Sequence, residues 1–315
     1  MASKIKSLIL NNSLVRKLID FSQRKSFPGF QGASIYDVGK LFLIGVQNGT
    51  FSTRASSLAF KFFFAVFPGI IFLFTLIPII PVDGFQTTLI DILKTNMPKG
   101  ISEIAISTIE DLISTPRGGL LSINFFLMLY LTTNGVHSLM IEFNNSYHVN
   151  ETRNPFMQRV ISVILAFVLT FLLLLSIALI IATHLLVDFA EQKDIINNDG
   201  LSSFLIHSAK WMMVFALYYF AIALLFYYGP AKRKHFKFFS PGSIVTTFLL
   251  IATSYGFSIY LQYFSTYNKI YGSIGTIMIV MLWFYLNSYI LLLGFDINTS
   301  IATAKKSNIL REEEN

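Results

Sequence analysis

The sequence has 315 residues, of which 54% are hydrophobic and 13% are charged, and its net charge is +7. Soluble domains carry about 25% charged residues, so this composition excludes an ordinary water-soluble fold and predicts a membrane protein. There is no cysteine, which excludes disulfides, a thiolate nucleophile and cysteine-based metal sites.

Six long apolar stretches follow one another along the chain, each close to the ~20 residues that cross the apolar core of a bilayer. They cover residues 55–80, 120–141, 160–184, 204–228, 243–264 and 273–297. Runs such as ISVILAFVLTFLLLLSIALIIA show no alternation, which favours helices over barrel strands. The sequence therefore predicts an all-α bundle of six transmembrane helices (51–301), with an N-terminal cytoplasmic or interfacial segment (1–50) and a disordered cytoplasmic tail (302–315).

The distribution of Lys and Arg predicts the orientation of these spans. Of the 24 basic residues, 17 lie in the two terminal segments and the even-numbered loops, and 5 lie in the odd-numbered loops; Lys61 and Lys210 lie within spans. Because cytoplasmic loops carry the excess of Lys and Arg, we expect both termini in the cytoplasm of a multi-pass protein.

Three further segments show helical periodicity outside the spans. In the N-terminal segment, apolar residues recur at helical spacing and predict a helix lying in the membrane interface: Ile35, Val38, Leu41, Phe42 and Val46. The first external loop, residues 82–117, has two similar patterns separated by Pro98. It predicts two short amphipathic helices on the outer surface.

The first span carries two basic residues and two prolines. Lys61 follows Arg54 by seven residues on the same helical face, about 10 Å deeper along the axis. Lys61 either snorkels back to the interface or is a cation facing an interior cavity. Pro68 and Pro78 each remove a backbone hydrogen bond from the helix.

Polar residues in the second and last spans complete a candidate intramembrane polar site. His137 lies inside the second span, where it is either a hydrogen-bonded structural residue or part of a relay, and Glu142 lies at its cytoplasmic end. In the last span Asp296 lies at the same membrane level, with Tyr285 on the same face. We expect an ion pair of Arg54 with Asp296 or Glu142, either locking the bundle or serving function.

Other features bear on partners and chemistry. The segment KRKHFKFF mixes basic and aromatic residues, as nucleic-acid binders do, but its position between two spans favours anionic lipid head groups at the cytoplasmic face. The sequence has no P-loop, HExxH or GxSxG motif, and its five histidines lack metal-ligand spacing. We therefore expect no catalytic residue, cofactor or metal, and no nucleic-acid partner.

At the first and last spans the sequence resembles the YihY/virulence factor BrkB family of bacterial inner-membrane proteins, formerly mislabelled ribonuclease BN. In the first span the matching residues are Arg54, Ala55, Leu58, Ala59, Phe60, Phe67 and Pro68. In the last span they are Tyr271, Gly272, Ser273, Gly275, Leu282, Trp283, Tyr285, Gly294 and Asn298. Asp296 stands where the family usually has Glu, and Lys61 departs from a position that is more often aromatic. The resemblance implies a protein of the bacterial cytoplasmic membrane.

Three hypotheses of function follow. The first is transport or translocation of a lipid or envelope component, which predicts a cavity where Arg54, His137, Tyr285 and Asp296 converge. The second is a non-transporting scaffold for envelope assembly, which predicts a closed bundle without a pocket at the midplane. The third, a membrane-bound ribonuclease, is the least favoured, because the sequence offers no metal-ligand cluster for phosphodiester cleavage.

Overall fold

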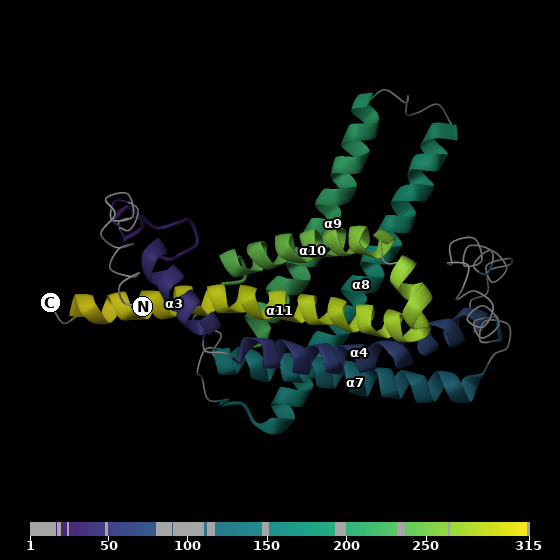
Figure 1. Ribbon diagram of the computed structural model, residues 1–315, viewed down its shortest axis with the longest axis horizontal. Helices are drawn as coiled ribbons and strands as arrows, with labels where there is room; N and C mark the ends of the chain where they lie inside the picture. The colour runs from purple at the N-terminus through teal and green to yellow at the C-terminus, as the bar shows by residue number, and fades with distance from the viewer. Residues whose placement is uncertain are drawn as a thin grey trace.

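The structure is a computed structural model that describes residues 25–47, 50–79, 117–146, 151–192, 200–231, 237–263 and 265–313, with positions 17, 20–23, 90, 110 and 111. Every regular element in these residues is helical, which confirms the all-α class. In chain order they are α3 (Ile35–Gln47), α4 (Phe51–Leu76), the 3-10 turn η1 (Ile77–Ile79), α7 (Gly118–Ser146), α8 (Pro155–Gln192), α9 (Gly200–Tyr228), α10 (Pro241–Tyr263) and α11 (Ser265–Glu313) (Figure 1).

Six helices are long and apolar enough to cross a membrane, which confirms the six predicted spans. The qualifying segments are Phe51–Ile79, Gly118–Ser146, Pro155–Ser176, Trp211–Tyr228, Pro241–Leu261 and Ile277–Ser307. α11 has 49 residues and bends near its start (Figure 1). Its spanning segment Ile277–Ser307 alone has 31 residues, about 46 Å at 1.5 Å per residue, which is longer than the ~30 Å apolar core of a bilayer.

The six spanning helices form a ring in which neighbours in the chain are neighbours in space. α4 packs on α7, α7 on α8, α8 on α9, α9 on α10 and α10 on α11, and α11 closes the ring against α4. α7 and α11 also touch each other across the ring. The inner side of α4 is therefore filled by these two helices.

The tightest packing lies at one end of the bundle, which we call the terminal end; there α4 and α10 begin and α7 and α9 finish. Three buried aromatic rings from three helices meet at this end: Phe143 stacks on Phe295 at 4.1 Å between centroids, and Phe226 meets both rings edge-on at 5.5 Å. Away from the terminal end, the backbones of α8 and α9 diverge from the other helices (Figure 1). The bundle is thus closed at the terminal end and splayed at the other.

α10 and α11 approach closely because each has a glycine at their crossing. A Cβ added at Gly242 would overlap the carbonyl oxygen of Gly294, and a Cβ added at Gly294 would overlap the hydroxyl of Thr246. The Thr246 hydroxyl donates to the Gly242 carbonyl at 2.7 Å. Backbones this close leave no room for a side chain, so both positions require glycine.

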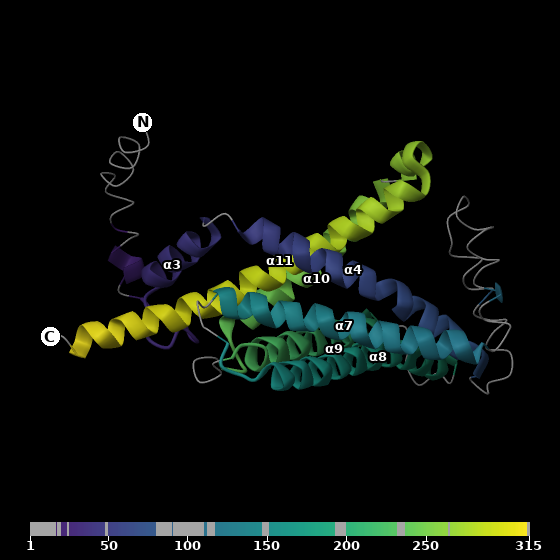
Figure 2. The same ribbon diagram turned by 90° about the horizontal axis from the view of Figure 1, so that it is seen from below.

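The predicted N-terminal helix is present as α3, which packs along the C-terminal part of α11 (Figure 2). Val38 of α3 is buried with Ala33, Ile301 and Ala304, while Leu43 of α3 remains exposed. The tail predicted to be disordered instead continues α11 to Glu313. The contact with α3 gives the start of this extension a buried face, which the charged sequence of the tail did not reveal.

The two amphipathic helices predicted for residues 82–117 lie largely outside the described residues. The same holds for the basic part of KRKHFKFF at 232–236.

Candidate functional site

Arg54 lies on the first turn of α4 and joins it to the end of α7. Its Nε donates to Glu142 Oε2 at 2.6 Å, and its Nη2 donates to the Ser146 hydroxyl at 2.6 Å and to the Glu142 carbonyl oxygen. The guanidinium also lies over the Phe51 ring, 5.6 Å from its centroid. The side chains of Arg54 and Glu142 are only 15% and 17% exposed. Of the two acidic partners predicted for Arg54, the structure shows Glu142.

Lys61 lies two turns further along α4 and also reaches α7. Its Nζ donates to the Ser138 hydroxyl at 2.6 Å, and Ser138 donates its own proton to the Asn134 carbonyl oxygen at 2.9 Å. Since α4 and α7 run antiparallel, with Phe62 beside Gly135, Ser138 lies slightly nearer the terminal end than Lys61. The side chain therefore leans toward the interface but stays against the protein.

Lys61 is partly exposed and lies at the border between the packed and the exposed sides of α4. Of its neighbours one turn away, Leu58 and Ala65 are buried, whereas Ser57 and Phe64 are exposed. α11 covers the opposite side of α4, where the Ser52 and Tyr285 hydroxyls lie 3.0 Å apart. Both alternatives for Lys61 stay predictions, and the described pocket is not lined by this residue.

The other candidate residues contact different helices. His137 Nδ1 lies 3.4 Å from the Ser162 hydroxyl on α8. Asp296 is buried on α11, and a Cβ added at Gly45 of α3 would lie 3.2 Å from its Oδ2. The structure thus joins Arg54 to Glu142 in what we call the α4–α7 seam, which is defined by Arg54, Lys61, Ser138 and Glu142. It brings neither His137 nor Asp296 into this seam.

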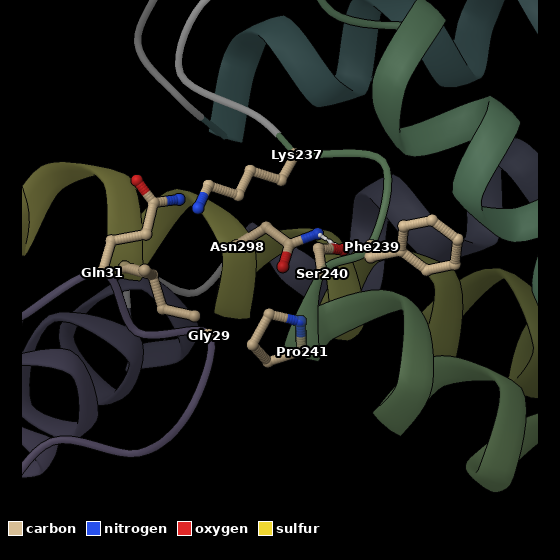
Figure 3. Close-up of a pocket in the computed structure, with 8 residues that line it drawn as sticks. Gly29, Gln31, Lys237, Phe239, Ser240, Pro241 and Asn298 are labelled. Carbon is tan, nitrogen blue, oxygen red and sulfur yellow. Dashed lines mark hydrogen bonds between the residues drawn. The ribbon is translucent and has the colours of Figure 1, made fainter.

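The described pocket lies elsewhere, at the terminal end (Figure 3). It is a shallow depression with a volume of about 10 Å³. Its lining is Gly29, Gln31, Lys237, Phe239, Ser240, Pro241, Asn298 and Ile301. Asn298 donates to the Ser240 hydroxyl and accepts from the Gly242 N–H, both at 2.9 Å. These polar groups satisfy one another and hold the start of α10. The volume is that of about one water molecule, far below the ~300–1,000 Å³ of usual ligand sites. None of the six candidate residues lines this pocket, so it is not the cavity predicted where Arg54, His137, Tyr285 and Asp296 converge.

The loop between α7 and α8 carries a polar cluster that we did not predict from the sequence. Glu151 accepts two hydrogen bonds from the Arg153 guanidinium, at 2.7 and 2.8 Å, and one from the Asn144 amide at 2.7 Å. Arg153 also donates to the Gly229 carbonyl at the end of α9, and Asn144 accepts from the Ala231 N–H, both at 2.9 Å. The cluster ties this loop to the end of α9. The only signal in the sequence was the polar run NNSYHVNETRN between two apolar spans.

We expect the cluster to make stability depend on acid pH. Burial raises the pKa of Glu151, but the hydrogen bonds and charge of Arg153 and the hydrogen bond of Asn144 outweigh it and hold this pKa below its ordinary value of 4.5. A carboxyl with a lowered folded pKa stabilises the protein fully above its unfolded pKa and loses this effect as pH falls through the folded pKa.

Thermal unfolding in detergent should therefore show a drop in Tm below about pH 4.5 that is smaller in Glu151→Gln. At neutral pH, Glu151→Gln should itself lower Tm, because it removes the ion pair with Arg153. Equal acid sensitivity in the two proteins would show that Glu151 does not contribute this effect.

Metal chemistry has no candidate in the described part of the chain. No group of three or more His, Asp or Glu residues there lies close enough to hold a metal ion.

Comparison with known proteins agrees with the motifs of the first and last spans. A family model described as virulence factor BrkB matches residues 43–315, which include all six spans. The chain belongs to the virulence factor BrkB family. The predicted resemblance is therefore confirmed.

Similar proteins of this family have names of two kinds. The ribonuclease-like protein YfkH of Bacillus subtilis is 26% identical over 254 residues, covering 81% of this chain and 91% of that protein. A UPF0761 membrane protein of Coxiella burnetii is 26% identical over 254 residues, 79% of this chain and 87% of that protein. Another, from Pseudoalteromonas translucida, is 31% identical over 117 residues, 37% of this chain and 36% of that protein. No solved structure matches this chain. BrkB membership thus establishes an integral membrane protein.

Proposed function

We propose that the protein translocates a lipid or a lipid-linked envelope component across the bacterial cytoplasmic membrane. The observation that carries this proposal is the α4–α7 seam, in which a hydrogen-bonded ion pair at the terminal end is followed, two helical turns further along α4, by a lysine. Charged groups within the apolar layer are costly and usually mark substrate or ion pathways.

The seam suits a substrate that has a polar head and apolar tails. Moving such a head group through the ~30 Å apolar core requires polar partners along the way, while the tails can stay in the bilayer. Because Ser57 and Phe64 beside Lys61 are exposed, a head group could enter the seam from the side. Toward the other end, Thr75 and Asn124 are buried polar residues bonded to carbonyls of their own helices.

The orientation inferred from the Lys and Arg distribution belongs to this proposal, with the terminal end in the cytoplasm. Since the chain has no cysteine, single cysteines can report it directly. A membrane-impermeant maleimide applied to spheroplasts should label Gly118→Cys and leave Ser307→Cys unlabelled. The opposite pattern would reverse the orientation.

Reconstituted vesicles test translocation. Vesicles containing a fluorescent phospholipid in both leaflets lose only the outer-leaflet signal when dithionite is added, unless lipid crosses the membrane. We expect the purified protein to make the inner-leaflet signal accessible as well. Ser57→Trp should slow this loss about tenfold or more, because the indole would fill the exposed face beside Lys61 and add a barrier of at least ~1.4 kcal/mol.

Ser56→Trp is the matched control. Ser56 is also exposed, but it points about 100° away from Ser57 around the helix, so it should leave the rate near that of the unmodified chain. Equal slowing by both variants would remove the seam as the route, and protein-containing vesicles that behave like empty ones would remove translocation itself.

A non-transporting scaffold is the second candidate function. The close packing of aromatic rings and glycines at the terminal end favours it, as does the position of the described pocket away from all six candidate residues. It predicts no lipid movement in the vesicle assay. We propose no nuclease activity. The word ribonuclease stands in the name of the Bacillus subtilis relative, and no metal-ligand group for phosphodiester cleavage lies in the described residues.

A further inference from the structure

Lys61 is a cation in the apolar layer with a neutral protein partner. In the described part of the chain its hydrogen bond is to the Ser138 hydroxyl, and no carboxylate lies within 4 Å of its Nζ. An ammonium group has three donors, and Ser138 accepts one of them. Two donors and the whole positive charge therefore lack a counterpart among these residues.

The nearest acidic residue along the seam is already engaged. Glu142 lies four residues from Ser138 on α7, about 6 Å further toward the terminal end. Its carboxylate accepts from Arg54 at 2.6 Å and from the Asn145 amide at 3.4 Å. The ion pair that fixes the first turn of α4 thus leaves Lys61 without that counter-charge.

The surroundings of Lys61 allow a membrane component to reach it. The Ser138 bond holds its Nζ against α7, and the exposed Ser57 and Phe64 flank it on α4. Phe64 is 46% exposed and Phe60, one turn before it, is 55% exposed; their rings lie 4.6 Å apart between centroids. An anionic oxygen from the bilayer would meet the ammonium here, with its acyl chains against the two rings.

We propose that Lys61 and Ser138 form a binding site for the phosphate of an anionic phospholipid. This phosphate lies further from the terminal end than the Arg54–Glu142 pair. A phosphate oxygen accepts from the free ammonium donors in a charge-assisted hydrogen bond. A head group without its own cation, such as that of phosphatidylglycerol, is favoured because no second ammonium competes for the phosphate. The use of this site in transport rests on the proposed function, whereas the binding itself does not.

Lipid binding to the purified full chain tests the site without measuring transport. The detergent-solubilised protein is titrated with phosphatidylglycerol or with zwitterionic phosphatidylcholine, and bound lipid is counted by native mass spectrometry. Lys61→Met should weaken phosphatidylglycerol binding about fivefold or more, the effect of one basic residue on an anionic lipid. It should change phosphatidylcholine binding little. Lys61→Arg, which keeps the charge, should retain most of the binding.

Lys306→Met is the matched control, because Lys306 is an exposed lysine near the end of α11. An equal loss in Lys306→Met and Lys61→Met would show general attraction to a basic protein and would overturn the site, as would unchanged binding in Lys61→Met. Because Lys61→Met removes a charge from the apolar layer, we expect it to fold; Lys61→Gln, measured beside it, must show the same loss.

The two proposals fail separately. Selective loss of phosphatidylglycerol binding in Lys61→Met, together with no lipid movement by the unmodified protein, would establish the site and remove translocation. Lipid movement by the unmodified protein together with full binding in Lys61→Met would support translocation and remove the binding site at Lys61.

Discussion

Replacing Arg54 by methionine is expected to destabilise the protein by about 3–5 kcal/mol, the cost of leaving one partner of a buried ion pair alone. The Glu142 carboxylate, only 17% exposed, would lose its 2.6 Å bond from Nε. The Glu142 carbonyl and the Ser146 hydroxyl would lose theirs as well. The measurement is Tm of the detergent-solubilised protein, with the yield of monodisperse protein after purification.

A double variant distinguishes the loss of the Arg54–Glu142 attraction from the cost of leaving the Glu142 carboxylate unpaired. Arg54→Met/Glu142→Met removes both charges, and replacement of a buried pair by apolar side chains is often near neutral. We therefore expect it to recover most of the stability that Arg54→Met loses. If the double variant is no better than the single one, the loss does not come from the unpaired carboxylate.

The exposed ion pair of Arg117 and Asp111 provides the matched control. Its two bonds are equally short, at 2.7 and 2.8 Å, but its side chains are 36% and 57% exposed. Solvent screens such a pair, which contributes about 0–1 kcal/mol. Arg117→Met should therefore leave Tm nearly unchanged, and a loss as large as that of Arg54→Met would mean that burial does not set the difference.

Most of the fold could be predicted from the sequence because the bilayer imposes a simple rule on it. A span must be a continuous apolar helix of about 20 residues, so hydropathy alone located all six. The Arg54–Glu142 pair was predictable for a related reason. Antiparallel neighbouring spans bring the start of one and the end of the next to the same membrane level, and a charge there needs a partner.

The way the candidate residues are distributed could not be predicted, because helical periodicity gives the faces of a helix but not its neighbours. His137 and Ser138 are adjacent in the sequence, yet one contacts α8 and the other α4. Which face meets which helix depends on the order of the ring, and hydropathy carries no information on that order. The Glu151–Arg153 cluster went unnoticed for a similar reason, since its anchor on α9 is 76 residues away from Arg153.

The close approach of α10 and α11 at Gly242 and Gly294 could not be predicted from the sequence. Gly294 was noted only because it matches the family motif, and the motif does not say why glycine is needed there. The structure supplies the reason, because the Thr246 hydroxyl, bonded to the Gly242 carbonyl, occupies the place that a side chain at Gly294 would need. Close backbone approach through small residues is a common way for membrane helices to associate. The match in the last span therefore marks a packing requirement rather than a site of chemistry.

Gly294→Ala is accordingly expected to have a second large effect. The added methyl group forces α10 and α11 apart, at about 1–3 kcal/mol for overpacking, and displaces the Thr246 hydroxyl from its buried hydrogen bond, at about 1–3 kcal/mol more. We expect a marked fall in Tm in detergent and in monodisperse yield.

Two variants show whether the close crossing is the cause. Gly256 also lies in α10, but nothing lies within 4 Å of a Cβ added there, so Gly256→Ala should keep or raise Tm through its better helix propensity. In Gly294→Ala/Thr246→Ala the overlapping hydroxyl is gone, while the Thr246 Cβ, 2.9 Å from the new Cβ, and the Gly242 carbonyl, 3.1 Å from it, remain. Partial recovery is therefore expected. A Gly294→Ala protein as stable as Gly256→Ala would mean that the two helices do not cross at this glycine pair.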